Sequence, residues 1–451
     1  MDIRSTEAWT LAKGKPGMII AVIDSGIDPR HPDFLNEDLN YNGQLDIDED
    51  TNRNFLLDPG EDFNGNGLLD TNEDINSNKI LDAGEDFNGN GVLDTDEDLN
   101  QNRVLDPGED LNGNGEVDTR EDINGNGILD PGRIWVNADE LPGDHNGDGC
   151  PGACGVDDDG DGLVDEDSRG REPGHPDYSG DTVLDDDENG LADDFQGWNF
   201  FGNRKCAVVE NRCSCESGPS TGNNNVADDF GHGTAVAGVV AGHADNQFGI
   251  SGVLWDARIM PLKVMDGNGC MTIDDEAAAI DYAVENGAQI IIIASGGGVF
   301  QQEEFEAIQR AESAGILVVA PAGNDGSNND LVPVYPASYD LKNILSIAAT
   351  DINDGLYFQS NFGVHSVDLG APGECIYTTL PLGSFSLQSR TNFNCTGLPF
   401  QPGFDYVSGT SFAAGFAAGG AGLLLTLNPF ISLEELKALI LLGVDPVEGL
   451  K

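Results

Sequence analysis

The chain has few basic side chains: 21 Lys and Arg stand against 80 Asp and Glu among 451 residues, and the net charge at pH 7 is −59. Nucleic acids and anionic membranes attract basic proteins, so both are poor partners for this surface as a whole, whereas cations are good ones. The imbalance is concentrated in residues 37–194, which hold 47 acidic and 7 basic side chains, a net charge of −40.

Long apolar segments are also missing. The longest, Phe412 to Leu427, has 16 residues and is rich in Gly and Ala, which is short for a membrane-spanning helix. No cleavable signal peptide is visible before the first apolar strand, GMIIAVIDSG, which begins at Gly17. The length nevertheless allows a sizeable core and two or three structural units.

The cysteines contain no CxxC pair, which makes a zinc site the weaker interpretation. Their even number favours disulfides formed in an oxidising compartment. Their spacing does not determine how they pair. The eight are Cys150, Cys154, Cys206, Cys213, Cys215, Cys270, Cys375 and Cys395.

A twelve-residue repeat fills the first part of the acidic segment. Asp recurs at positions 38, 50, 62, 74, 86, 98, 110 and 122, which gives eight units. Asn follows two and four residues later, Asp comes at the ninth position and Glu at the twelfth, except that Arg133 ends the eighth unit. These are oxygen-bearing positions of an EF-hand calcium loop, in which the last Glu supplies both of its oxygens.

We therefore predict that the repeats bind several calcium ions. The predicted ligands in the eight units are Asp38, Asn40, Asn42, Asp46, Glu49, Asp50, Asn52, Asn54, Asp58, Glu61, Asp62, Asn64, Asn66, Asp70, Glu73, Asp74, Asn76, Asn78, Asp82, Glu85, Asp86, Asn88, Asn90, Asp94, Glu97, Asp98, Asn100, Asn102, Asp106, Glu109, Asp110, Asn112, Asn114, Asp118, Glu121, Asp122, Asn124, Asn126 and Asp130. Looser copies follow, and one of them adds Asp157, Asp159, Asp161 and Asp165.

The sixth position of the loop alternates between Gly and a larger residue through the first seven units, as in Gly43, Phe55 and Gly67. Because this position turns sharply, the pattern indicates a 24-residue unit made of two loops. The eighth position is apolar in every unit, which is too little for a separate core, so neighbouring loops must stack. The region resembles tandem calcium-loop arrays such as thrombospondin type-3 repeats. The alternative is a solvated, self-repelling acidic tract, which would not need the regular apolar residues.

Four motifs flank this segment in a fixed order. IIAVID delivers Asp24 at the end of an apolar strand, where open α/β sheets place their chemistry. DDFGHGTAVAG places His232 at a helix start, and GILVVAPAGNDG is a strand that runs into Asn324. SGTSFAAG places Ser411 at the start of a helix, whose N-terminus favours a developing negative charge. Alone, the Asp and His motifs are more often structural than catalytic.

Together the motifs resemble the subtilisin-like serine proteases, whose triad has the chain order Asp, His, Ser. The resemblance covers residues 7–36 and 195–443. It implies an α/β fold with a doubly wound, mostly parallel sheet. The calcium loops would then be a long insertion between the Asp motif and the His motif.

This interpretation divides the chain into three parts. Residues 1–36 and 195–451 form the expected catalytic domain, residues 37–133 the tandem calcium-loop array, and residues 134–194 a looser acidic calcium-loop segment. An insertion of this length is tolerable because the entropy cost of closing a loop grows slowly with its length. We expect calcium to stiffen the insertion and to fix how His232 is presented. The alternative is an insertion that leaves catalysis unchanged.

The resemblance also implies roles for individual residues. His232 would take the proton of Ser411 and return it to the leaving amine, while Asp24 would orient the imidazole. Asn324 and the backbone N–H of Ser411 would bind the oxyanion.

The segment AQIIIIASGGG would be the strand and loop along the bound peptide. Ser295, Gly296 and Gly297 would offer it backbone hydrogen bonds, so that the substrate adds as a further strand. Departures from the family pattern are Ile293 in place of the usual Asn, Gly415-Phe416 in place of Pro-His, and the segment 357–359.

We therefore expect a calcium-dependent serine endopeptidase that acts on polypeptides through an acyl-enzyme. The alternative is a catalytically impaired protease fold that serves as a calcium-binding scaffold. Family members are commonly secreted with a signal and a propeptide, so this chain is expected to be a mature or truncated form of an extracellular protein. Millimolar extracellular calcium suits such loops. Polypeptide substrates and calcium ions are the expected partners, without nucleic acid or membrane.

Other polar residues are expected to have structural roles. Asp28 and Asp33 are candidates for a calcium or turn network, with turn capping the expected role. Thr272 and Ser432 are expected to begin helices. The histidines without triad context, expected to be structural or on the surface, are His31, His145, His175, His243 and His365.

Overall fold

A computed structural model describes the parts of the chain outside most of the acidic segment. All of the predicted calcium ligands lie outside the described residues, as do His145, His175, Cys150 and Cys154. The described residues are 5–29, 31–34, 133–135, 191, 196–209, 212–216, 220–244, 249–383, 385, 387, 395 and 403–447.

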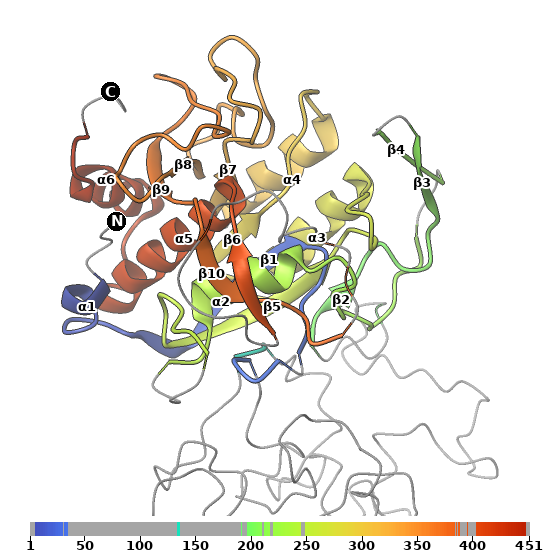
Figure 1. Cartoon of the computed structure of the whole chain (residues 1–451), viewed down its shortest axis with the longest axis horizontal. Helices are drawn as coiled ribbons and strands as arrows, with labels where there is room; N and C mark the ends of the chain where they lie inside the picture. The colour runs from blue at the N-terminus through green and yellow to red at the C-terminus, as the bar shows by residue number, and fades with distance from the viewer. Residues whose placement is uncertain are drawn as a thin grey trace, which may run out of the picture.

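Seven parallel strands form the central sheet in the order β2-β5-β1-β6-β7-β8-β9 (Figure 1). The chain therefore places β5 on one side of β1 and β6 on the other, which is the reversal of strand order typical of a doubly wound sheet. This confirms the predicted α/β fold with a mostly parallel sheet. The strands are β1 Gly14–Asp24, β2 Trp198–Asn199, β5 Asp256–Lys263, β6 Ile290–Ile293, β7 Leu317–Pro321, β8 Ile344–Thr350 and β9 Leu369–Pro372.

Helices cover both faces of this sheet (Figure 1). Side chains of β1 alternate between two cores: Ile20 and Val22 pack with α2 and α5, whereas Ala21 and Ile23 pack with α3 and α4. A strand buried on both faces needs apolar residues at consecutive positions, which explains the run IIAVI. The helices are α1 Ser5–Ala8, α2 His232–Ala241, α3 Ile273–Glu285, α4 Gln302–Ser313, α5 Thr410–Leu427 and α6 Leu433–Gly443.

The helix starts predicted from sequence are confirmed. The Thr272 side chain accepts a hydrogen bond from the backbone N–H of Asp275 and begins α3. Ser432 and Glu435 form a reciprocal capping box at the start of α6. Each pairing satisfies backbone donors that the first helical turn would otherwise leave without partners.

Among the described residues, two small antiparallel sheets of two strands each stand outside the main sheet. β3 (Cys206–Val209) pairs with β4 (Arg212–Cys215), and β10 (Ile376–Thr379) pairs with β11 (Phe404–Val407). The predicted disulfides are present in the described residues. They join Cys206 to Cys215, Cys213 to Cys270 and Cys375 to Cys395.

A short part of the acidic segment packs on the sheet. Ile134 forms a parallel bridge with Ile259 of β5, and the Arg133 and Trp135 backbones continue this hydrogen bonding. Ile134 is 6% exposed and Trp135 7%, so both belong to the core. The boundary expected between the calcium-loop array and the looser segment thus falls on residues that contact the α/β domain.

Helix α5 is long and apolar enough to cross a membrane by length and composition, with 18 residues and a mean hydropathy of 1.4. However, 61% of it is buried inside the domain, where it packs on the sheet. We therefore interpret α5 as a core helix.

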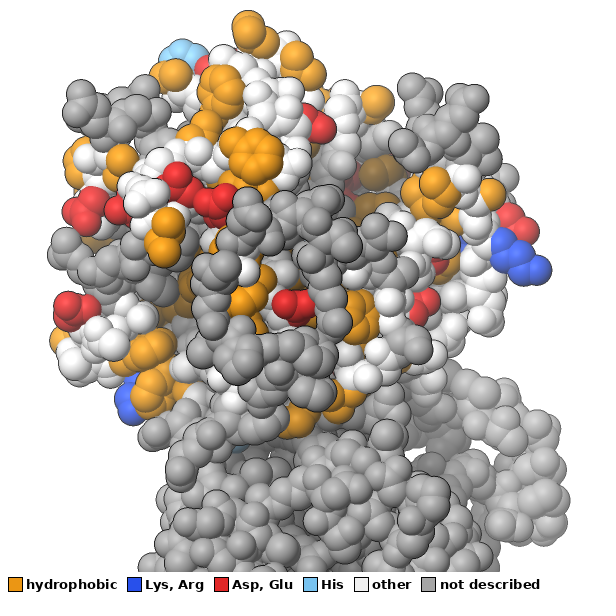
Figure 2. Space-filling view, viewed as in Figure 1, with side chains coloured by type: hydrophobic (Ala, Val, Ile, Leu, Met, Phe, Trp, Pro, Cys, Tyr) orange, Lys and Arg blue, Asp and Glu red, His pale blue; other side chains and the backbone are white. Residues whose placement is uncertain are grey.

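The described surface keeps the acidic character of the sequence. On the face shown in Figure 2, acidic side chains are visible across the surface among apolar ones, whereas basic side chains are visible only near its edges. This distribution agrees with the small number of Lys and Arg in the chain.

Candidate active site

The predicted catalytic residues gather at the carboxyl ends of three neighbouring strands. Asp24 is the last residue of β1, Ala294 follows β6 directly, and Asn324 lies in the loop after β7. Parallel strands end at the same edge of a sheet, and this edge is where the strand order reverses around β1. The α/β framework therefore brings residues that are about 300 positions apart in the sequence to one place.

The structure places Asp24 against His232. The His232 Nδ1 donates to both carboxylate oxygens of Asp24, at 2.8 Å to Oδ2 and 3.0 Å to Oδ1. Asp24 is fully buried, and its Oδ1 also accepts the backbone N–H of Ser25 at 2.7 Å. Burial lowers the pKa of His232, but the charge and hydrogen bond of Asp24, helped by Asp228, outweigh burial and raise it overall.

Ser411 is the second residue of α5 and is 5% exposed. Its hydroxyl donates to the backbone carbonyl of Ala294 at 3.2 Å. The His232 ring is tilted by 50° against the Phe412 ring, with 5.3 Å between their centroids, so the imidazole lies beside the start of α5. In its predicted role, the Ser411 hydroxyl would have to turn from Ala294 toward His232, and loose catalytic hydrogen bonds are common without substrate.

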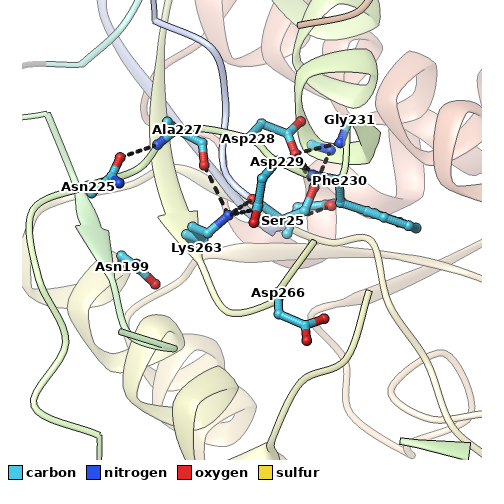
Figure 3. A network of polar contacts seen from close by, with 12 residues as sticks. Ser25, Asn199, Asn225, Ala227, Asp228, Asp229, Phe230, Gly231, Lys263 and Asp266 are labelled. Carbon is cyan, nitrogen blue, oxygen red and sulfur yellow. Dashed lines mark hydrogen bonds and ion pairs between the residues drawn. The ribbon is translucent and has the colours of Figure 1, made fainter. Parts of the chain in front are cut away.

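A second buried carboxylate, Asp228, supports the His232 loop, and the sequence analysis missed it (Figure 3). Its Oδ1 accepts from the Ser25 hydroxyl at 2.8 Å and the Gly231 N–H at 2.6 Å. Its Oδ2 accepts the Thr234 N–H at 2.9 Å and hydroxyl at 2.6 Å. Asp228 thereby joins the residue after Asp24 to the first turn of α2. Its position four residues before His232 was the only sequence signal.

Lys263, at the end of β5, extends this network (Figure 3). Its buried ammonium donates to the carbonyls of Ser25 at 2.6 Å and Ala227 at 3.0 Å, and pairs with Asp229 at 2.5 Å. A buried ammonium needs such partners, because an unpaired charge in the interior costs several kcal/mol. Lys263 thus connects the loop after β1 to the loop before α2.

Asn324 contacts the turn that presents Ser411. Its Oδ1 accepts the Thr410 N–H at 2.9 Å and hydroxyl at 3.2 Å, so the Nδ2 amide takes no part in these two hydrogen bonds. The buried Asn361 fixes the Asn324 loop, because its Oδ1 accepts the N–H groups of Asp325 at 2.9 Å and Ser327 at 3.0 Å. The predicted oxyanion donors therefore come from a loop and a helix start that hold each other in place.

The three predicted substrate-binding residues differ in their backbone contacts. Gly297 exchanges two hydrogen bonds of 2.8 Å with Tyr335, so its N–H and carbonyl are already paired. Within the described residues, the N–H groups of Ser295 and Gly296 have no such partner. Because the N–H groups of consecutive residues in an extended chain point to opposite edges, an added peptide strand would pair with one of these two donors.

Ile293, Gly415 and Phe416, which depart from the family pattern, pack in or against the core. Ile293 is fully buried in β6 opposite Ile23 of β1. A Cβ on Gly415 would approach Val239 of α2 to 3.1 Å, so a small residue there suits the close packing of α2 and α5. Phe416 packs partly buried against the same core.

The other predicted polar residues have structural contacts. His31 is fully buried, its Nδ1 accepts the Asp33 N–H at 3.1 Å, and burial lowers its pKa to about 4. Asp28 accepts the backbone N–H of Leu382 at 3.0 Å and Asp33 that of Ile250 at 3.2 Å, so these bonds link the loop after β1 to segments distant in the sequence and are not turn caps. His243 is buried and His365 is exposed. In the described part of the chain, no three His, Cys, Asp or Glu side chains are grouped to hold a metal ion.

The state of the His232 ring defines the chemical class. Because Asp24 holds Nδ1, the other ring nitrogen is left to accept a proton, and Ser411 supplies a hydroxyl at the same edge of the sheet. A site of this kind belongs to the serine hydrolases.

Comparison with known proteins gives the family. The subtilase family model matches residues 15–445, and the chain therefore belongs to the subtilase family. Its class is that of the subtilisin-like serine endopeptidases.

Several curated proteins are similar to the chain. Thermitase of Thermoactinomyces vulgaris is 32% identical over 280 residues, which are 62% of this chain and 80% of thermitase. Subtilisin DY of Bacillus licheniformis is 31% identical over 48% of this chain and 71% of its own length. The cell wall-associated protease of Bacillus subtilis (strain 168) is 35% identical over 50% of this chain, but the match spans only 22% of that protease. A cold-adapted subtilisin-like serine proteinase of known structure aligns with a TM-score of 0.40 and 25% identity, over 48% of this chain and 69% of that one.

Proposed function

We propose that this protein is an active endopeptidase that hydrolyses peptide bonds with Ser411 as the nucleophile. His232 takes the serine proton during attack and returns it to the leaving amine, and Asp24 holds the imidazole in the required tautomer. The observation that carries the proposal is the 2.8 Å contact between His232 Nδ1 and the buried Asp24, beside the helix that starts at Thr410. An impaired scaffold would not need this buried, charged arrangement.

The tetrahedral intermediate places negative charge on the former carbonyl oxygen. The Asn324 amide and the Ser411 backbone N–H would donate to it, and the hydrogen bond from Thr410, the residue before Ser411, to Asn324 supports this role. The Ser295 and Gly296 backbone would bind the substrate as an added strand.

The acidic insertion is proposed to bind calcium and the protein to act outside the cell. The repeat spacing supports calcium binding, and the disulfides together with the named cell wall-associated relative support an extracellular location. No step of the peptide hydrolysis requires the calcium ions themselves. Their expected effect is on the folding and stiffness of the insertion.

Casein turnover tests the proposal. The wild-type protein and Ser411→Ala are compared in millimolar calcium and again after chelation. Turnover that requires Ser411 establishes the endopeptidase, and a loss after chelation establishes its calcium dependence. A folded, calcium-loaded wild-type protein that leaves casein and a panel of peptides intact would refute the proposed activity.

A further inference from the structure

A cavity of about 270 Å³ lies beside the loop that follows β6. Ser295 is part of its lining. Ser295 follows Ala294, and the Ala294 carbonyl accepts a hydrogen bond from the Ser411 hydroxyl. An extended peptide advances about 3.3 Å per residue with side chains on alternate sides. The cavity is therefore within reach of a substrate side chain a few residues from the scissile bond.

Two buried carboxyl groups line this cavity, Glu276 from α3 and Glu304 from α4. Glu276 is 1% exposed and Glu304 is 3% exposed. The Ser295 hydroxyl donates to Glu276 Oε2 at 3.0 Å, and the Tyr339 hydroxyl donates to Glu304 Oε2 at 2.6 Å. The other Glu276 oxygen, Oε1, is buried without a hydrogen-bond partner in the described structure.

In the part of the chain that the structure describes, the carboxyl pair lacks a positive partner. Within the described residues, neither Glu276 nor Glu304 forms an ion pair with Lys, Arg or His. Burial raises the pKa of Glu276 well above its usual range, and the charge of Glu304 and its hydrogen bond add to this effect. Burial and the neighbouring Glu304 thus favour the protonated form of Glu276, and a cation bound in the cavity would favour its charged form.

The rest of the lining suits a long cationic side chain. Met271, Ile273 and Val299 offer apolar contacts for a methylene stem. Tyr335 adds an aromatic ring, which packs against Tyr339 with 4.7 Å between their centroids. Aromatic faces and carboxylates together favour ammonium and guanidinium groups.

We propose that this cavity is a subsite for a lysine or arginine side chain of the polypeptide substrate, with Glu276 and Glu304 as its specificity-determining residues. The bound cation displaces the proton of Glu276, which leaves to solvent, and its N–H groups supply the donor that Glu276 Oε1 lacks. The inference rests on the proposed endopeptidase activity.

A peptide panel tests the inference. Peptides carry Lys, Arg or the uncharged norleucine at each position around the scissile bond, and kcat/KM is measured for the wild type, Glu276→Gln and Glu304→Gln. At one position the wild type should prefer Lys to norleucine by about tenfold or more, and each variant should reduce this ratio by about tenfold. The ratio is the readout because a smaller fraction of folded enzyme does not change it.

Glu303→Gln is the matched control, because Glu303 is exposed in the first turn of α4 and does not line the cavity. It should keep the wild-type ratio. A wild-type ratio near one at every position would overturn the inference, and so would a preference that survives in both cavity variants.

If no peptide is cleaved, the proposed activity fails, and a binding measurement still tests the cationic subsite. Butylguanidinium and butanol are titrated calorimetrically into Ser411→Ala, with and without Glu276→Gln. The cationic subsite is supported if butylguanidinium binds, butanol does not, and Glu276→Gln weakens the binding of butylguanidinium about tenfold. Equal or absent binding of the two compounds contradicts it.

Discussion

At the residue scale, the contact between Asp24 and His232 determines how activity depends on pH. His232 can accept a proton only when it is neutral, and its pKa is raised above the ordinary value of 6.5. We therefore expect kcat/KM to increase as pH rises through an apparent pKa above 6.5. A wild-type midpoint at or below 6.5 in the pH–rate profile would contradict this account.

Asp24→Asn should lower kcat/KM by about 10⁴, because the imidazole loses its orienting carboxylate.

Asn324 provides a second residue-scale prediction. Asn324→Ala should reduce kcat by about 10² to 10³ with a much smaller change in KM, because the lost donor acts mainly on the transition state. Asn353→Ala is the control, since Asn353 is an exposed asparagine outside the site. Steady-state kinetics on one peptide distinguishes the two, and an equal effect of both substitutions would exclude the oxyanion role.

The site residues that have local sequence signals could be predicted. Asp24, His232 and Ser411 each lie at the end of an apolar strand or the start of a helix, and neighbouring residues in the sequence indicate such boundaries. The pair of Glu276 and Glu304 was not predicted, because it forms only when α3 and α4 pack together. Contacts between distant segments leave no pattern in a single sequence.

At the element scale, the small residues of α5 decide how closely it packs. A Cβ on Gly419 would lie 2.5 Å from the Val253 Cβ, whereas a Cβ on Gly420 would meet nothing within 4 Å. Gly419→Ala should lower the free energy of unfolding by about 1–3 kcal/mol through overpacking. Gly420→Ala should raise it by up to about 1 kcal/mol, because Ala is the better helix former.

Urea unfolding of the two variants provides the comparison. Both replacements are the same and lie on one helix, so differences in helix propensity largely cancel. If Gly419→Ala proved as stable as Gly420→Ala, the close approach of α5 to Val253 would not contribute to stability.

The elements themselves were largely predictable, whereas some of their pairings were not. The apolar run before Asp24 and the caps at Thr272 and Ser432 indicated their elements because the determinants are local. The link between Cys213 and Cys270 could not be deduced, since eight cysteines permit many connectivities.

At the scale of the whole molecule, residues 133–135 return to the sheet between the two acidic parts of the insertion. Excision of residues 38–130 or of residues 138–190, each with a short Gly-Ser linker, leaves this contact in place. Excision of residues 38–194 removes it together with two buried apolar side chains, each of which contributes about 1.5–3 kcal/mol. We therefore expect the full excision to be the least stable of the three.

The response to calcium is expected to differ between the two parts of the insertion. Excision of residues 38–130 should abolish most of the calcium-induced decrease in hydrodynamic radius, because it removes the first seven loops and every predicted ligand of the eighth. Excision of residues 138–190 should preserve most of it. A wild-type radius that does not respond to calcium would refute calcium-dependent compaction of the array.

The most direct measurement of the central claim is covalent labelling by a serine-directed fluorophosphonate. The reagent is applied to the wild type, Ser411→Ala and His232→Ala in millimolar calcium, and the modified peptide is identified by mass spectrometry. The account predicts a single adduct on Ser411 in the wild type, none at that position in Ser411→Ala, and much slower labelling in His232→Ala. A folded wild type that is not labelled at Ser411, or that is labelled equally fast without His232, would contradict it.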